Sequence, residues 1–124
     1  MTTQEKLEKI VRILDSKKAE DIQVIGITNL TILADYFIIA TGTSTTQVKS
    51  LADEVEFQLG ESGVEARGIE GLRTANWIVL DYSDIVVHVF YRGTREEYQL
   101  ERLWADGEQV DISHLLIDAG GQNA

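Results

Sequence analysis

Residues 76–91 read NWIVLDYSDIVVHVFY and predict a β-hairpin. Two runs rich in β-branched and aromatic residues flank Ser83 and Asp84, a pair that favours a tight turn. Tyr82 then lies opposite Ile85, and side chains alternate between the two faces of the hairpin. One face is apolar apart from a single phenol, so we expect helices to cover it. That face consists of Ile78, Leu80, Tyr82, Ile85, Val87 and Val89.

The other face of this hairpin mixes aromatic, apolar and polar side chains. Aromatic residues dominate the binding energy of protein interfaces, while polar residues fix the register of the partners. The pattern fits a recognition surface, and it equally fits a core face beneath a further helix with the carboxylate hydrogen-bonded locally. The cross-strand pairs on this face are Trp77 with Phe90, Val79 with His88, and Asp81 with Val86.

Three helices are predicted around the hairpin. Apolar residues recur at helical spacing over residues 7–14 and again over residues 48–59. A third helix follows the hairpin and carries the apolar side chains of residues 98–104. Capping boxes are predicted at the three helix starts, formed by Thr2 with Glu5, Ser44 with Gln47, and Thr94 with Glu97.

Three further strands are predicted at residues 21–27, 35–42 and 64–69. Residues 37–40 are apolar at every position, as in a strand that is covered on both faces in the middle of a sheet. The order of the elements predicts a single α/β domain with a mixed sheet of about five strands and flanking helices. Residues 1–106 are assigned to this domain, and the polar residues 107–124 to a loosely ordered C-terminal tail.

The composition of the 124-residue chain excludes several functional classes. There is no cysteine, which rules out disulfides, thiolate metal sites and cysteine nucleophiles. Eleven Lys and Arg stand against 21 Asp and Glu, giving a formal net charge of −10. This charge disfavours nucleic acid or an anionic membrane as the main partner and favours a basic protein. The chain has no signal-like start and no apolar run near the roughly 20 residues of a membrane span, so we expect a cytoplasmic protein.

A nucleotide-binding enzyme is the competing hypothesis. The loop from Thr41 to Thr46 follows a buried strand and opens a helix, where backbone amides can bind phosphate. A nucleotidyltransferase would also need paired carboxylates for a divalent metal, and the sequence has no Asp-x-Asp. The two histidines, His88 and His114, do not have the spacing of a zinc site. We therefore expect no catalytic residue, metal or cofactor, and keep nucleotide binding by this loop as the alternative.

Four segments resemble, in order and spacing, the motifs of the ribosomal silencing factor family, also called Iojap-like. They are ADYFIIATGTS at 34–44, WIVLD at 77–81, DIVVHVF at 84–90 and YQLERLW at 98–104. The resemblance extends over about residues 7–106, most of the chain. It implies a fold similar to that of nucleotidyltransferases, with no known catalysis.

The resemblance also implies a partner and a site. Members of the family bind the large ribosomal subunit through its protein number fourteen, block joining of the small subunit and lower translation when nutrients are scarce. Their binding surface involves the hairpin and the following helix. Trp77 and Tyr98 would be the anchors, and Asp81 and Glu101 would face basic groups, with Arg95 orienting them. Carried over to this sequence, the partner-binding residues are Trp77, Asp81, His88, Phe90, Arg95, Tyr98, Leu100 and Glu101.

Several features of this region leave alternatives open. Tyr98, Leu100 and Trp104 are also candidates for the core. Ser83 stands where the family usually has glycine, and Glu97 stands where a large apolar residue is common, which weakens the apolar edge of the expected contact. The same aromatic strand surface could pair with a second copy of the chain, so a homodimer of the free protein is a further hypothesis.

Overall fold

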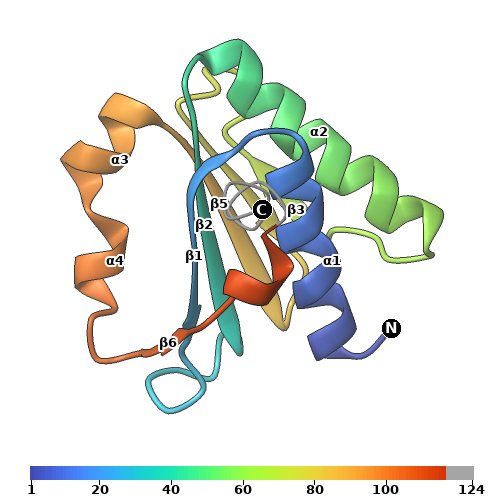
Figure 1. The fold of residues 1–124 in the computed structure, drawn as a ribbon, viewed down its shortest axis with the longest axis vertical. Helices are drawn as coiled ribbons and strands as arrows, with labels where there is room; N and C mark the ends of the chain where they lie inside the picture. Colours follow the sequence, from blue (N-terminus) through green and yellow to red (C-terminus); the bar gives the residue numbers. More distant parts are fainter. Residues whose placement is uncertain (117–124) are drawn as a thin grey trace.

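The computed structural model of the chain describes residues 1–116. These residues form a mixed sheet with helices on both faces (Figure 1). Along the chain the elements are α1 (Thr3–Ser16), β1 (Glu20–Gly26), β2 (Tyr36–Gly42), α2 (Thr45–Glu61), β3 (Gly68–Glu70), β4 (Trp77–Asp81), β5 (Ile85–Tyr91), α3 (Arg92–Tyr98), α4 (Leu100–Leu103), β6 (Glu108–Val110) and the 3-10 turn η1 (Ser113–Leu115).

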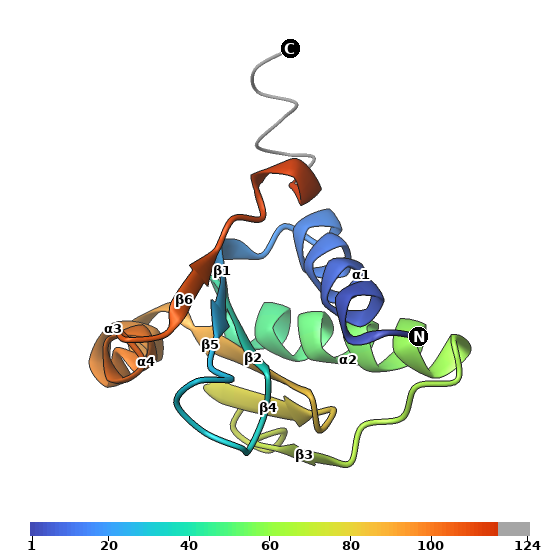
Figure 2. The same cartoon turned by 90° about the horizontal axis from the view of Figure 1, so that it is seen from below.

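Within this part of the chain the sheet has six strands in the order β3-β4-β5-β2-β1-β6. The neighbours β2 and β5 run parallel, and all other neighbours run antiparallel. Helices α1 and α2 cover one face, while α3 and α4 lie on the opposite face (Figure 2). The predicted α/β class and mixed sheet are therefore confirmed, with one strand more than expected. Residues 37–40 lie in β2, inside the sheet as predicted.

The hairpin has the predicted register. Trp77 pairs with Phe90, and Asp81 pairs with Val86. The face expected to lie under helices is buried and belongs to the main core beneath α1 and α2. Ser83 has a φ of 75°, in the left-handed region that glycine adopts with the least strain. Its backbone N–H donates to Asp81 Oδ1 at 2.8 Å, which holds the turn in this conformation.

Asp84 connects the hairpin turn to the start of α1. Its carboxylate accepts a hydrogen bond from Thr3 Oγ1 at 2.6 Å and pairs with Lys6 Nζ at 2.7 Å. Burial alone would raise the pKa of Asp84, but these two contacts outweigh burial and lower the pKa. The turn is thus fixed against α1 by contacts between residues about 80 positions apart in sequence.

The three predicted capping boxes have different outcomes. At α1 the box is complete, because the Glu5 N–H donates to Thr2 Oγ1 and the Thr2 N–H donates to Glu5 Oε1. At α2 only half of it forms: Ser44 Oγ accepts from the Gln47 N–H, but the Gln47 side chain does not reach back to Ser44.

The box predicted at Thr94 with Glu97 is wrong. Helix α3 begins at Arg92 and has no side-chain cap, because β5 runs directly into it without a loop. The predicted single helix is also interrupted. Gln99 has a φ of 50° and separates α3 from α4.

Two other boundaries also need correction. The strand predicted at 64–69 begins later and extends one residue further, as β3, and the Val64 N–H instead bonds Leu59 O at the end of α2. The loose tail predicted from residue 107 is wrong for residues 107–116. Residues 108–110 form β6 on the edge of β1, and Ile112 and Leu115 are buried in the main core. The remainder of the predicted tail, residues 117–124, lies outside the described residues.

Among residues 1–116, no helix combines the length and the apolar content that crossing a bilayer requires.

Candidate partner-binding surface

The eight predicted binding residues lie around the sheet face opposite α1 and α2, and they differ in exposure. Tyr98 is 52% exposed, and Trp77, Asp81 and Glu101 are half-buried. The other four are buried, so in this conformation they support the surface from below; they are His88, Phe90, Arg95 and Leu100.

Six aromatic rings form a continuous cluster on this face. We call them the aromatic cluster; they are Phe37, Trp77, His88, Phe90, Tyr98 and Trp104. Trp77 is central, with ring centroids 4.8 Å from Phe90 and 4.9 Å from Tyr98. Phe37 connects the other end, 4.7 Å from His88 and 5.0 Å from Trp104. One surface is therefore built by residues of three strands, β2, β4 and β5, and by residues at the C-terminal ends of α3 and α4.

Phe37 was not among the predicted site residues. It reaches the cluster because β2 and β5 are parallel neighbours, with Phe37 opposite Val86. Its alternation along β2 shows that it shares a face with Ile39, but no local pattern indicates which strand lies beside β2. The two strands lie more than 40 residues apart, and their pairing depends on tertiary contacts that the sequence pattern does not specify.

His88 and Trp77 are joined by a hydrogen bond. The indole Nε1–H of Trp77 donates to His88 Nδ1 at 3.1 Å. A ring nitrogen that accepts is unprotonated, so the imidazole is neutral and carries its proton on Nε2. Burial lowers the pKa of His88 to about 4. His88 therefore stays neutral at physiological pH and fixes the orientation of the Trp77 ring.

This burial predicts a pH dependence of stability. The pKa of His88 is about 4 when folded and near 6.5 when unfolded, so the unfolded state takes up the proton first as the pH falls. We expect the free energy of unfolding to decrease by roughly 3 kcal/mol between pH 6.5 and pH 4 from this residue. Urea denaturation across this range should show a decrease that is larger in the wild type than in His88→Gln, which keeps only the contributions of carboxylates such as Asp81 and Asp84. Parallel pH profiles for the two proteins would contradict the assignment.

Asp81 lies at the edge of the surface and already has a cationic neighbour. Its Oδ2 accepts from Arg67 Nη2 at 2.9 Å, and Arg67 is largely exposed. Burial alone would raise the pKa of Asp81, but the hydrogen bonds from the Ser83 N–H and Arg67 outweigh it and lower the pKa. Asp81 is thus charged and is partly accessible at the edge of this surface.

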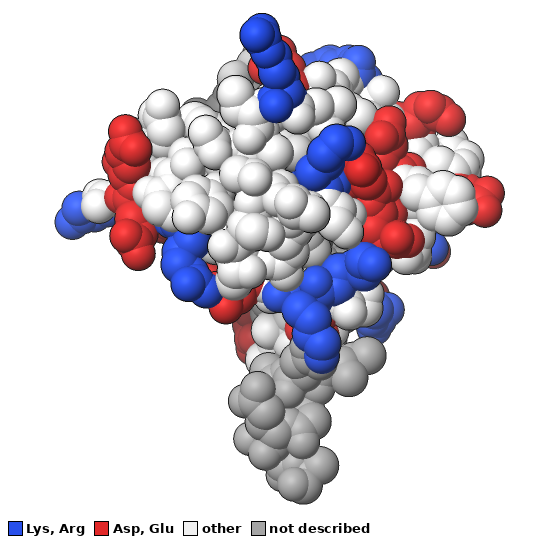
Figure 3. All heavy atoms as spheres, turned by 90° about the horizontal axis from the view of Figure 1, so that it is seen from above, with Lys and Arg blue, Asp and Glu red and all other residues white. Residues whose placement is uncertain are grey.

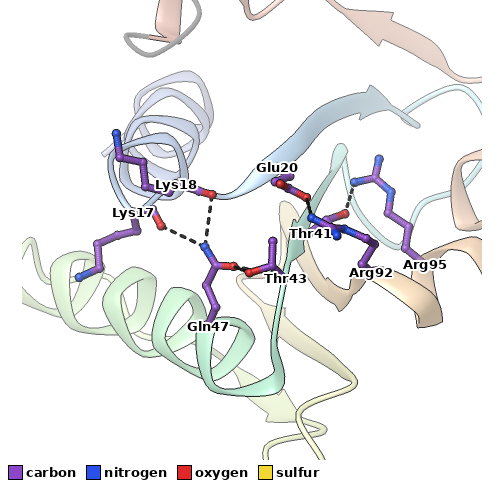
Figure 4. A network of polar contacts seen from close by, with 8 residues as sticks. All are labelled: Lys17, Lys18, Glu20, Thr41, Thr43, Gln47, Arg92 and Arg95. Atoms are coloured by element: carbon purple, nitrogen blue, oxygen red, sulfur yellow. Dashed lines mark hydrogen bonds and ion pairs between the residues drawn. The ribbon is translucent and has the colours of Figure 1, made fainter.

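Arg95 is buried and attaches α3 to the sheet. Its Nη1 donates to Thr41 Oγ1 at 2.7 Å (Figure 4) and to the Asp21 carbonyl at 2.6 Å. Its Nε donates to Glu101 Oε2 at 3.1 Å, and Nη2 lies 3.2 Å from Asp21 Oδ2. Arg95 and Glu101 therefore bind each other and hold both α3, which ends at Tyr98, and α4 against the strands.

A cavity of about 540 Å³ lies beside this network, between the start of β1, the end of β2 and the helices α3 and α4. Its arginines are engaged by acceptors of the chain itself, Arg92 by Glu20 and Arg102 by Gln99. Because four carboxylates line the same cavity, it offers no excess of positive charge for an anion.

Within the loop from Thr41 to Thr46, both donors of Thr43 are used inside the chain, so they are not free to bind a nucleotide phosphate. The Thr43 N–H and Oγ1 both donate to Gln47 Oε1, at 2.6 and 2.9 Å (Figure 4). Gln47 Nε2 in turn donates to the carbonyl of Lys18 at 3.2 Å. Figure 3 looks onto this end of the molecule and shows a broad uncharged area, with both basic and acidic side chains at its edges. Among residues 1–116 no group of three potential metal ligands is found.

Comparison with known proteins shows the family to which this chain belongs. A family model described as ribosomal silencing factor during starvation matches residues 1–123. The chain belongs to this family. The ribosomal silencing factor of Halalkalibacterium halodurans is 36% identical over 116 residues, which are 94% of this chain and 99% of that protein. The resemblance inferred from the four sequence motifs is thereby confirmed.

Solved structures and more distant relatives agree with this assignment. A crystal structure of a Chromobacterium violaceum protein superimposes with a TM-score of 0.83 at 37% identity, covering 90% of this chain and 92% of that chain. The mouse protein named mitochondrial assembly of ribosomal large subunit protein 1 is 30% identical over 101 residues. Those residues are 79% of this chain and 44% of the mouse protein.

Proposed function

We propose that this protein is a translational repressor of the cytoplasm. It binds the large ribosomal subunit through ribosomal protein number fourteen, blocks joining of the small subunit and slows translation when nutrients are limiting. Membership of a family described by ribosomal silencing during starvation supports this proposal. The name of the mouse relative, which refers to the large ribosomal subunit, supports the choice of subunit.

The aromatic cluster is the observation that carries the proposed binding site. Trp77 and Tyr98 contact each other at a centroid distance of 4.9 Å and retain accessible surface, as interface anchors must. The buried rings of His88 and Phe90 hold Trp77 in place, so little side-chain freedom is lost on binding. An accessible aromatic pair on a fixed support suits the recognition of a folded protein surface.

The charge of the chain supports a basic partner. The net charge of −10 repels ribosomal RNA, so the main contact is with protein. Beside the anchors, Glu97 is exposed and has no ion-pair partner among the described residues. Glu97 replaces the apolar residue common in the family with a charge, which a lysine or arginine of the partner complements.

A subunit-joining experiment tests the proposed inhibition. Separated large and small subunits are mixed with and without the protein, and complete ribosomes are quantified on sucrose gradients. We expect fewer complete ribosomes when the large subunit is incubated with the protein first, and little change when joined ribosomes receive it afterwards. Equal joining with and without saturating protein would contradict the proposal.

The homodimer remains a separate proposal for the free protein. Since the aromatic cluster would be shared between two copies, a dimer and a ribosome-bound monomer would exclude each other. Light scattering after gel filtration measures the mass directly. If the protein were a monomer at all concentrations, the dimer proposal would be refuted and the proposal of ribosome binding would be unaffected.

A further inference from the structure

The loop between β1 and β2 exposes aliphatic side chains that the core does not use. Leu30 is 42% exposed, Leu33 is 74% exposed and Ile32 is fully exposed. Single exposed apolar residues are normal on protein surfaces, but these three fall within four consecutive positions. Their grouping on one loop indicates a contact surface.

This loop is ordered by its own hydrogen bonds. The N–H groups of Leu30 and Thr31 both bond the carbonyl of Ile27, and the Leu33 N–H bonds Thr31 Oγ1. At the base of the loop, the Ile27 N–H bonds the carbonyl of Asp35 at 2.9 Å. A loop held in this way presents its aliphatic side chains in a fixed arrangement and loses little conformational freedom when it binds.

The loop continues the surface that carries the aromatic cluster. Its two ends, Ile27 and Ala34, are buried in the same apolar cluster as Phe90, against which Phe37, Trp77 and Trp104 pack. Figure 2 shows the loop, in cyan between β1 and β2, projecting on the side of the sheet that carries α3 and α4. A partner seated on the aromatic cluster therefore lies beside this loop.

An acidic notch of about 180 Å³ adjoins the loop, between Leu30, Tyr36 and the start of β6. Asp106 and Glu108 line it and are exposed, and the described part of the chain provides neither carboxylate with an ion-pair partner. Two unneutralised carboxylates next to exposed aliphatic groups match a partner surface that combines apolar residues with lysine or arginine.

We propose that the loop at residues 30–33 forms a second contact with the basic ribosomal protein bound by the aromatic cluster. Ile32 and Leu33 cover an apolar area of that protein, and the notch receives one of its basic side chains. This inference rests on the proposed function and adds to it a part of the interface separate from Trp77 and Tyr98.

The test compares binding of four proteins to purified large subunits by quantitative co-sedimentation. They are the wild type, Ile32→Ser/Leu33→Ser, Trp77→Ala, and the control Phe57→Ser. Phe57 is 62% exposed on α2, on the opposite face of the sheet. We expect the double variant to raise the Kd by about tenfold or more and the control to leave it within about twofold. Because both serine replacements are at exposed positions, the midpoint of urea unfolding should stay that of the wild type.

The outcomes separate this inference from the proposed function. If the wild type binds, Trp77→Ala does not and the double variant binds like the wild type, the loop contact is refuted and the proposed function stands. If the wild type does not bind large subunits, both the loop contact and the proposed function are refuted. A second pair of variants tests the notch: Asp106→Lys/Glu108→Lys should weaken binding, and the loss should shrink as salt is raised. Unchanged binding by the Asp106→Lys/Glu108→Lys variant would refute the proposal that the notch receives a basic side chain.

Discussion

We expect Trp77→Ala to weaken the proposed binding to the large ribosomal subunit by at least about thirtyfold, equivalent to about 2 kcal/mol. Trp77 is a partly accessible ring at the centre of the aromatic cluster, and its truncation also frees Tyr98, which packs against it. The measurement is the Kd from co-sedimentation with purified large subunits, made on a variant whose circular dichroism confirms that it is folded.

A second substitution shows which property of Trp77 matters. Trp77→Phe keeps an aromatic ring but loses the Nε1–H that donates to His88. We expect it to bind more tightly than Trp77→Ala and more weakly than the wild type, because ring contact remains while the ring orientation is freed. If Trp77→Ala bound like the wild type, the aromatic cluster would be core and not interface.

We expect Gly71→Ala to destabilise the fold by on the order of 3 kcal/mol. Gly71 has a φ of 87°, which strains any residue with a Cβ atom, and an added Cβ would overlap the carbonyl oxygen of Trp77. The overlap is with backbone, so no side-chain rotation relieves it. We expect urea denaturation to show the loss, and ribosome binding to weaken too because the start of β4 must move.

Gly60→Ala is the matched control for this prediction. Gly60 lies near the end of α2, and nothing lies within 4 Å of the position its Cβ would take. Alanine is favoured over glycine within helices by up to about 1 kcal/mol, so this variant should be slightly more stable than the wild type. Equal destabilisation by the two substitutions would show that the close approach at Gly71 is not the cause.

The parts of the fold that were predictable are those determined by local chemistry. The hairpin register follows from a two-residue turn and strict alternation, so the pairing of Trp77 with Phe90 could be derived before the structure. The start of α1 was likewise determined by two residues at capping-box spacing, Thr2 and Glu5. Both features depend on contacts between residues close together in the sequence.

The parts that could not be predicted depend on tertiary contacts. Residues 108–110 combine two polar residues with Val110 and have a weak strand pattern, and they form β6 only because the edge of β1 is available. Arg95 was expected at the partner surface, but its buried position depends on acceptors from β1 and β2, among them Thr41. The exposure of Ile32 and Leu33 could not be predicted from the sequence either, since apolar residues are expected to be buried.

Co-sedimentation with separated ribosomal subunits tests the central claim most directly. The wild-type protein is incubated with purified large or small subunits and centrifuged, and the bound fraction is measured for each. We predict that it sediments with the large subunit alone and that ribosomal protein number fourteen crosslinks to the face carrying Trp77. Sedimentation with the small subunit, or with neither subunit at micromolar concentrations, would contradict the account.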